Sequence, residues 1–411
     1  MAVSGSIEKL ASQRERDLDL REDWTEVELP RGLFVFAEKP KVSQEEREIP
    51  RPLETGRWEN YRIFVYPNEF FPEGQNYGIK ALAEGGRGEI ILGWLNGIGI
   101  ARKSSEGFLS AFQSVRIPPE FGIDTIVSQI APTKENGVYF GGVNGFVWLS
   151  PEGNLILISD PTDLFGRLRG IDWFGSYGDG AVAARETELY YLQGNTLRKW
   201  LSPRRNHLGV SDQILALASG GLNNQVCYGI ISVNEGDDWR RWERHLYRFG
   251  FSSDPKTPLI TEDLGVIPGF GTEKLMEAKL DLNRGVMYGR EQGPCCDYLG
   301  YVFLDTRESG RFKVTPTDSY PDLRDFSLAP DGNLWVALEV WGVTMVKDPF
   351  SEQREGKTVP VNQIANPYSQ SIIAEGGNIW SGHRFLPGQF NNALVTQFKG
   401  PPRVYLPLVE K

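Results

Sequence analysis

A phrase of three apolar strands joined by glycine-centred turns recurs along this chain. It reads IKALAEGGRGEIILGWLNGIGIAR from Ile79 and IVSQIAPTKENGVYFGGVNGFVWLSP from Ile126. It returns as FSLAPDGNLWVALEVWGVTMVKDP from Phe326 and as SIIAEGGNIWSGHRF from Ser371. Self-similarity at a period of about 45 residues is the signature of small sheets repeated around an axis. The repeat therefore constrains the fold more tightly than any other feature of the sequence.

The strand phrases can be counted from Tyr61 to the end of the chain. The innermost strand of each unit is expected to begin near Ile79, Ile126, Gly170, Ile214, Leu275, Leu323 and Ser371. Period-2 alternation marks the outer strands, whereas the inner strands are more uniformly apolar, as expected for strands buried on both faces. The sequence predicts an all-β fold, a seven-bladed β-propeller over residues 58–411, with an outsized fourth unit.

A closed ring needs a strand that joins its first and last units, because an unpaired edge is a template for aggregation. Two segments compete for the outer edge of the last unit, namely YRIFVYP (residues 61–67) and RVYLPL (residues 403–408). The N-terminal segment is favoured, since each unit then begins with its innermost strand.

Residues 1–57 differ from the rest and are predicted to form a helical and extended N-terminal arm. Ser6 can cap a helix that runs to about Asp23, with Ile7 and Leu10 on its apolar face. The segment ELPRGLFVFAEKP is a short strand candidate, and a charged, proline-punctuated linker follows it. A helix with so narrow an apolar face is marginal alone, so we expect it to dock on the ring or on another protein chain.

Composition limits the classes of function. The formal net charge of −10 disfavours binding to a phosphate backbone, so no nucleic-acid partner is expected. Three cysteines cannot build a disulfide framework, and neither a signal peptide nor a membrane-spanning run is evident. We expect a protein that folds in a reducing cytoplasm and either stays there or enters a particle assembled there.

The phrases APDGNLWVALEVWGVTMV and EGGRGEIILGWLNGIGIAR resemble the repeats of two-component-regulator-type propellers. They resemble NHL-type and streptogramin-lyase-type propellers more loosely. The shared element is a glycine and asparagine before an apolar pair ending in Trp, followed by a glycine-centred turn and another strand. The resemblance implies a propeller fold. In the lyase type it also implies a His and a Glu that carry activity; His383 matches by register, but no second His follows the pattern.

The turns between the second and third strands of each unit are expected to surround the mouth of a central channel, where ligands of such rings usually sit. His383, Arg185 and Arg290 occupy equivalent positions there, and Glu339 supplies a carboxylate. These four residues form the candidate catalytic set of a lactonase or lyase. The alternative is that they form ion pairs between neighbouring units. Further channel-mouth candidates are Trp94, Asn144, Trp341 and Arg384.

No cofactor is expected, with calcium as the alternative. A calcium-dependent lactonase would need oxygen ligands that converge on the channel. The candidate metal ligands are Asn144, Asn234, Asp325 and Glu339. Cys295 and Cys296 are expected to be free thiols and Cys227 a core residue.

The long fourth unit contains NEGDDWRRWERHLYRFGF, and loops longer than their counterparts often carry function. Trp and Arg are the residue types enriched at protein interfaces. The candidate partner-binding residues are Trp239, Arg240, Arg241 and Trp242, with Ile7 and Leu10 of the arm. Alternatively, the tryptophans cover the sheet itself. The leading hypothesis is a non-enzymatic interaction or structural module, for instance a component of a virus or phage particle, and the alternative is the channel-mouth enzyme.

Overall fold

A computed structural model gives the conformation of much of the chain. The structure describes residues 27–28, 57–64, 78–103, 109–160, 162–201, 212–234, 242–252, 254, 259–268, 275–291, 298–314, 323–339, 342–347, 349–350, 356–358, 369–375, 378–383 and 392–399. The predicted helix from Ser6 to Asp23, including Ile7 and Leu10, lies outside the described residues.

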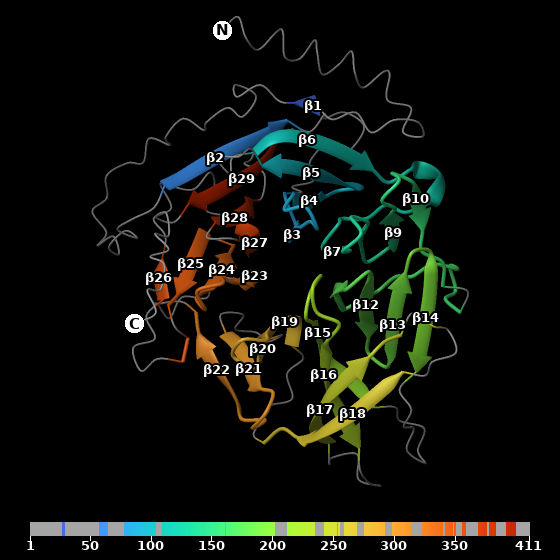
Figure 1. Ribbon diagram of the computed structural model, residues 1–411, viewed down its shortest axis with the longest axis vertical. Helices are drawn as coiled ribbons and strands as arrows, with labels where there is room; N and C mark the ends of the chain where they lie inside the picture. The colour runs from blue at the N-terminus through green and yellow to red at the C-terminus, as the bar shows by residue number, and fades with distance from the viewer. Residues whose placement is uncertain are drawn as a thin grey trace, which may run out of the picture.

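The described strands form seven antiparallel sheets arranged around an axis (Figure 1). From the inner to the outer edge, the first sheet contains β3 (Ala81–Glu84), β4 (Ile90–Trp94), β5 (Gly97–Lys103), β6 (Leu109–Arg116) and β1 (Val27–Glu28). The second contains β7 (Gln129–Pro132), β8 (Val138–Gly142), β9 (Gly145–Leu149) and β10 (Leu155–Leu157). The third contains β11 (Trp173–Tyr177), β12 (Gly180–Arg185), β13 (Glu188–Gln193) and β14 (Thr196–Leu201).

The remaining four sheets follow the same inner-to-outer order. The fourth contains β15 (Gln213–Ser219), β16 (Cys227–Asn234), β17 (Trp242–Gly250) and β18 (Ile260–Val266). The fifth contains β19 (Leu275–Asp281), β20 (Val286–Glu291), β21 (Tyr298–Phe303) and β22 (Ser309–Lys313). The sixth contains β23 (Leu323–Leu328), β24 (Leu334–Leu338), β25 (Gly342–Val346) and β26 (Gly356–Thr358). The last contains β27 (Ser369–Glu375), β28 (Asn378–His383), β29 (Asn392–Lys399) and β2 (Arg57–Phe64).

The innermost strands close into a ring. Each contacts the next in the order β3, β7, β11, β15, β19, β23 and β27, and β27 contacts β3 again. Their first residues lie within three positions of the starts expected from the repeat. The prediction of an all-β propeller is confirmed, with one sheet for each predicted unit.

The ring is joined by the N-terminal strand, as predicted. β2 pairs with β29 along its whole length, from Arg57 opposite Lys399 to Phe64 opposite Asn392. β1 adds a fifth strand to the first sheet by pairing with β6, so part of the predicted arm contacts the ring. Among the described residues the helical structure is a 3₁₀ turn, η1 (Pro119–Phe121), and no helix there is long and apolar enough to cross a membrane.

Apolar side chains fill the space between neighbouring sheets. Between the first and second sheets, for example, Ile98 and Val115 pack with Val127, Phe140 and other buried residues. Close approach of the backbones demands small residues at some positions. A Cβ atom on Gly142 would lie 2.1 Å from the carbonyl oxygen of Ile126. Glycine at this position therefore lets β8 approach the connection that enters the second sheet.

We expect Gly142→Ala to destabilise the ring by about 2 kcal/mol or more, because the new methyl group must displace backbone atoms. Gly250→Ala is the matched control, since its Cβ would meet its nearest neighbour, Ile260, at 3.4 Å, an ordinary contact. Chemical unfolding of both variants measures the difference. Equal stabilities would contradict this description of the first and second sheets.

Candidate functional site

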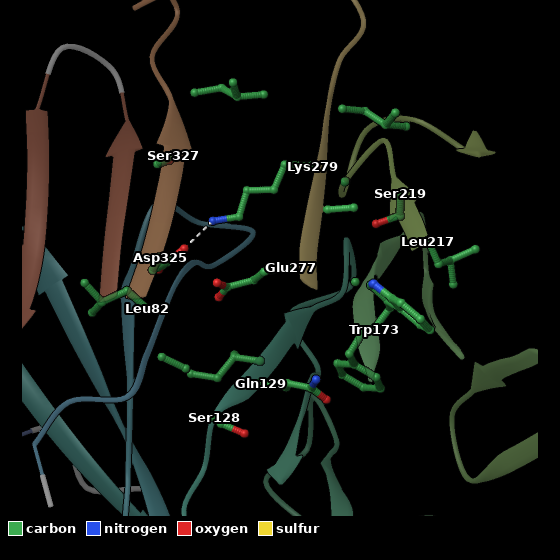
Figure 2. A pocket seen from close by; sticks show the side chains of 18 of the residues that line it. Leu82, Ser128, Gln129, Trp173, Leu217, Ser219, Glu277, Lys279, Asp325 and Ser327 are labelled. Atoms are coloured by element: carbon green, nitrogen blue, oxygen red, sulfur yellow. Dashed lines mark hydrogen bonds and ion pairs between the residues drawn. The ribbon is translucent and has the colours of Figure 1, made fainter. Parts of the chain in front are cut away.

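A cavity of about 350 Å³ lies on the axis of the ring. The innermost strands or their ends in six of the seven sheets line it, and Figure 2 shows several of the side chains. The volume is at the small end of the range for ligand sites in proteins. The polar residues of this cavity, rather than the turns around its mouth, form the candidate ligand site.

Asp325 joins three sheets at the cavity wall. It lies on β23, is 5% exposed, and its Oδ2 accepts a hydrogen bond of 2.8 Å from the backbone N–H of Ile372 on β27. Its Oδ1 accepts a hydrogen bond of 2.8 Å from Nζ of Lys279 on β19. Lys279 also donates to the carbonyl oxygen of Phe326. Both carboxylate oxygens of Asp325 are therefore engaged in holding neighbouring sheets together.

Glu277 lies beside Asp325 and Lys279, but unlike them it has a polar atom that no described residue engages. A β-bulge interrupts β19 between Met276 and Lys279, and Glu277 within it has a φ of 56°, in the left-handed region. Its Oε2 is buried and has no hydrogen-bond partner among the described residues. Burial raises the pKa of Glu277 to about 7, with the Asp325 carboxylate acting in the same direction against the opposing charges of Arg290 and Lys279.

Two donors cross the axis region to backbone carbonyls. Nε1 of Trp173 on β11 donates a 2.6 Å hydrogen bond to the carbonyl oxygen of Leu275, which links the third and fifth sheets. Nε2 of Gln129 donates to the carbonyl oxygens of Ile171 and Asp172, each at 3.3 Å. Oε1 of Gln129 is buried and has no partner among the described residues. The cavity thus contains engaged donors and two unengaged acceptors.

The structure describes a contact for each of the four predicted catalytic residues. His383 is 0% exposed in β28, and its Nδ1 lies 3.3 Å from Oγ of Ser369. Arg185 forms ion pairs with Glu188 and, at 3.5 Å, with Asp163. Arg290 donates a 2.8 Å hydrogen bond to the carbonyl oxygen of Leu323.

Glu339, the fourth member, is paired with Arg324 on the neighbouring strand. The groups that were expected to act on a substrate are therefore engaged in ion pairs and hydrogen bonds close to the predicted turns.

Two of the other four channel-mouth candidates are described. Trp94 is 1% exposed because its side chain belongs to the core around β4. Asn144 is exposed, and its amide donates to the carbonyl oxygen of Asp124. Trp341 and Arg384 lie outside the described residues.

Each predicted calcium ligand whose side chain the structure describes has a partner of its own. Asn144 is at the surface, Glu339 is paired with Arg324, and Asp325 accepts hydrogen bonds at the axis. The side chain of Asn234 is outside the described part of the structure. No group of three or more His, Cys, Asp or Glu residues in the described part could hold a metal ion.

Of the predicted partner-binding residues, Trp242 is described, at the start of β17, where it is partly buried. Trp239, Arg240 and Arg241 lie outside the described residues, as do Cys295 and Cys296. Cys227 is a buried core residue, as predicted, and burial raises the pKa of its thiol.

A surface loop between β10 and β11 is the second candidate site. In this displayed loop, which consists of residues 162–170, Leu164 is 89% exposed and Phe165 57% exposed. Val143, at the β8–β9 turn, is 75% exposed and lies beside the loop, since its carbonyl oxygen accepts a 3.0 Å hydrogen bond from the N–H of Gly170. Three large apolar side chains are therefore exposed on one part of the surface.

Acidic side chains fix the displayed loop. Asp160 is 1% exposed, and its Oδ1 accepts hydrogen bonds from the N–H and the hydroxyl of Thr162 at 3.0 and 2.7 Å. Oδ1 of Asp163 accepts from the N–H of Phe165 at 2.9 Å and from Nε of Arg169 at 3.0 Å. The guanidinium carbon of Arg169 lies 3.9 Å from the centroid of the Phe165 ring. The loop presents its apolar residues on an ordered backbone.

Of the cavity residues, sequence reasoning named Asp325 as a candidate calcium ligand, but it missed Glu277, Lys279 and the displayed loop. The signal for the cavity was present: LMEAKLD (residues 275–281) carries Glu277 and Lys279 in a strand expected to be buried on both faces. The signal for the loop was the pair Leu164 and Phe165 within a turn-rich connection. Glu277 and Lys279 are charged where the repeat predicts apolar residues. Leu164 and Phe165 are apolar where a polar turn is expected.

No protein-family model matches the sequence, and no curated protein matches it. Solved structures do match. The virginiamycin B lyase of Staphylococcus aureus aligns with a TM-score of 0.53 at 12% identity, covering 84% of this chain and 99% of the lyase. YCF48 bound to a D1 peptide aligns with a TM-score of 0.52 at 9% identity, covering 86% of this chain and 98% of YCF48.

The extracellular domain of a hybrid two-component system from B. thetaiotaomicron aligns with a TM-score of 0.50 at 14% identity, covering 80% of this chain and 39% of that one. These matches include the lyase and two-component types that the repeats resemble. At such identities they show the β-propeller fold alone.

Glu277→Gln should change how stability depends on pH. The folded protein holds the Glu277 proton to a pKa of about 7 rather than the ordinary 4.5, so wild-type stability should fall as pH rises through this interval. The variant cannot ionise there. At about pH 8 it should be more stable than wild type by up to about 3 kcal/mol, and at about pH 4.5 nearly equal.

Chemical unfolding at the two pH values measures this difference. Glu262→Gln on β18 is the matched control because Glu262 is exposed, and its substitution should leave the pH profile unchanged. A difference between wild type and Glu277→Gln that does not vary with pH would show that Glu277 ionises as freely as a surface carboxyl group.

Proposed function

We propose that this protein is a non-enzymatic interaction module, a rigid propeller that attaches to other protein chains through its displayed loop. One observation carries the proposal: Leu164 and Phe165 are exposed on a loop whose backbone is held by buried acidic side chains. Ordering a loop in order to expose apolar side chains gives the isolated chain no hydrophobic stabilisation. Burial against a partner would supply it.

The residue types around the loop support a protein partner. Two guanidinium groups lie near the Phe165 ring, with the carbon of Arg169 at 3.9 Å and that of Arg167 at 5.8 Å from its centroid. Arginine and aromatic residues dominate the binding energy of protein interfaces. Because the loop is already ordered, binding costs less conformational entropy than ordering it on contact. The expected partner surface is an apolar pocket with acidic residues at its rim.

Architecture gives independent support. YCF48, a propeller of similar fold, has a structure with a bound peptide, so the fold accommodates polypeptide ligands. The predicted roles of residues 1–57 and of the fourth-unit insertion concern mostly residues outside the described part, and they stay predictions. Membership of a virus or phage particle likewise stays a prediction. The lactonase or lyase alternative also stays a prediction, and each of its four residues contacts another described group.

The double variant Leu164→Ser/Phe165→Ser tests the proposal. Ile260→Ser is the matched control, because Ile260 is 64% exposed at the start of β18, on a different sheet. Both variants should fold with stabilities within about 0.5 kcal/mol of wild type, since they change exposed positions. A partner identified by affinity capture and then purified should bind the loop variant at least about tenfold more weakly and bind the control normally.

Sedimentation of the purified protein distinguishes a second copy of this chain from a different protein as the partner. Concentration-dependent dimers that the loop variant abolishes would identify a second copy of this chain as the partner. Equal binding of the purified partner to wild type and to the loop variant would refute the assignment of this surface.

A further inference from the structure

The axial cavity contains acceptors that lack donors. Oε2 of Glu277 and Oε1 of Gln129 are buried without a partner among the described residues, and both residues line the cavity. Buried polar atoms in native proteins nearly always have a hydrogen-bond partner, and exceptions call for an explanation. Two exceptions in one cavity indicate a place where a ligand supplies the hydrogen bonds.

Three of the side-chain donors in the cavity wall are already engaged. Nζ of Lys279 bonds Asp325 and the Phe326 carbonyl oxygen. Nε1 of Trp173 bonds the Leu275 carbonyl oxygen, and Nε2 of Gln129 lies between two further carbonyl oxygens. A ligand that bonds the two unpartnered acceptors must bring donors of its own. An anion or a pure acceptor would gain nothing from these two atoms.

The charges around Glu277 favour a cation. Asp325 faces it from β23, Lys279 lies on its own strand and Arg290 approaches from β20, while Asp172 adds another carboxyl group to the cavity wall. Lys279 and Arg290 supply two positive charges against the three carboxyl groups of Glu277, Asp325 and Asp172, and Lys279 is paired with Asp325. The ionised Glu277 carboxylate is disfavoured by burial and by Asp325, so a positive charge placed at Oε2 would stabilise it.

The backbone conformation of β19 that places the Glu277 carboxyl group beside the cavity is strained. Residues other than glycine rarely adopt a positive φ, and bulges often redirect a side chain beside a functional site. Glu277 does so at a bulge, and Figure 2 shows its carboxyl group pointing into the space between β19 and β23. The strain aims an acidic side chain at the cavity instead of away from the axis.

Apolar side chains form part of the rest of the wall. Trp173, Phe174, Leu217, Leu280 and Leu328 line the same cavity of about 350 Å³. A small inorganic ion would leave these surfaces without contacts. We propose that the axial cavity binds an organic ammonium ion that carries an apolar group, with its N–H groups donating to Glu277 and Gln129.

Three compounds of one shape test the proposal on the full chain. Benzylamine carries the ammonium group, benzyl alcohol is a neutral donor and benzoate is an anion. Titration calorimetry at about pH 8 should show benzylamine binding at least about tenfold more tightly than either of the others. Benzyl alcohol binding as tightly as benzylamine would overturn the requirement for a cation, and tighter binding of benzoate would overturn the whole assignment.

The pH dependence identifies the carboxyl group. Ionised Glu277 is the form that binds an ammonium ion, so the affinity for benzylamine should rise about tenfold between about pH 6 and about pH 8. Binding at about pH 6 should also release protons, measured as a dependence of the heat on the buffer. An affinity that does not change over this range would contradict the role of Glu277.

Variants locate the binding. Glu277→Gln should lower the affinity at about pH 8 at least about tenfold and remove its pH dependence, while Glu262→Gln, at an exposed position, should change neither. Gln129→Met, which removes the second acceptor, should weaken benzylamine binding by about threefold to tenfold. If Glu277→Gln does not fold, the wild-type pH profile and the Gln129 variant still decide the question. Unchanged affinity in both variants would show that benzylamine binds elsewhere.

Discussion

The whole ring depends on the joint between its last and first sheets, since an open edge would leave backbone groups unpaired. The joint has an outer and an inner part. β2 pairs with β29 at the outer edge, and near the axis the hydroxyl of Ser371 donates to the carbonyl oxygen of Ile79, 292 positions away in the chain. Contacts between such distant residues are entropically costly until the intervening sheets have formed. Closure therefore couples the stability of every sheet to that of its neighbours.

Closure also brings the innermost strands together around the axis. Their polar side chains then either link neighbouring sheets or remain available to a ligand. Asp325 has both oxygens engaged, with Lys279 of one neighbouring sheet and the Ile372 N–H of the other, so it holds the ring. Glu277, two residues from Lys279, has an oxygen that nothing described engages. A buried carboxyl group whose charged form burial destabilises, and which has one oxygen without a partner among the described residues, is a candidate for ligand binding.

The repeat was sufficient to predict the strands, their order and the closing strand, because alternation, glycine turns and repeat length are local properties. The functional sites were not predictable in the same way. His383, Arg185 and Arg290 have the residue types of a catalytic set, but inter-strand partners such as Ser369 and Glu188 engage them, and pairing register is known only from the structure. Glu277 reaches the cavity because of a bulge and a positive φ, which a sequence pattern does not reveal.

The two candidate sites meet in one segment of backbone. The displayed loop ends at Gly170, and the next two residues carry the carbonyl oxygens that bind Nε2 of Gln129. This orientation of the amide leaves Oε1 of Gln129 as the acceptor without a described partner. The position of that acceptor thus follows from the same connection that displays Leu164 and Phe165. Glu277 is fixed separately by the bulge in β19, so the charge of the cavity is independent of the loop while its second hydrogen-bond acceptor is not.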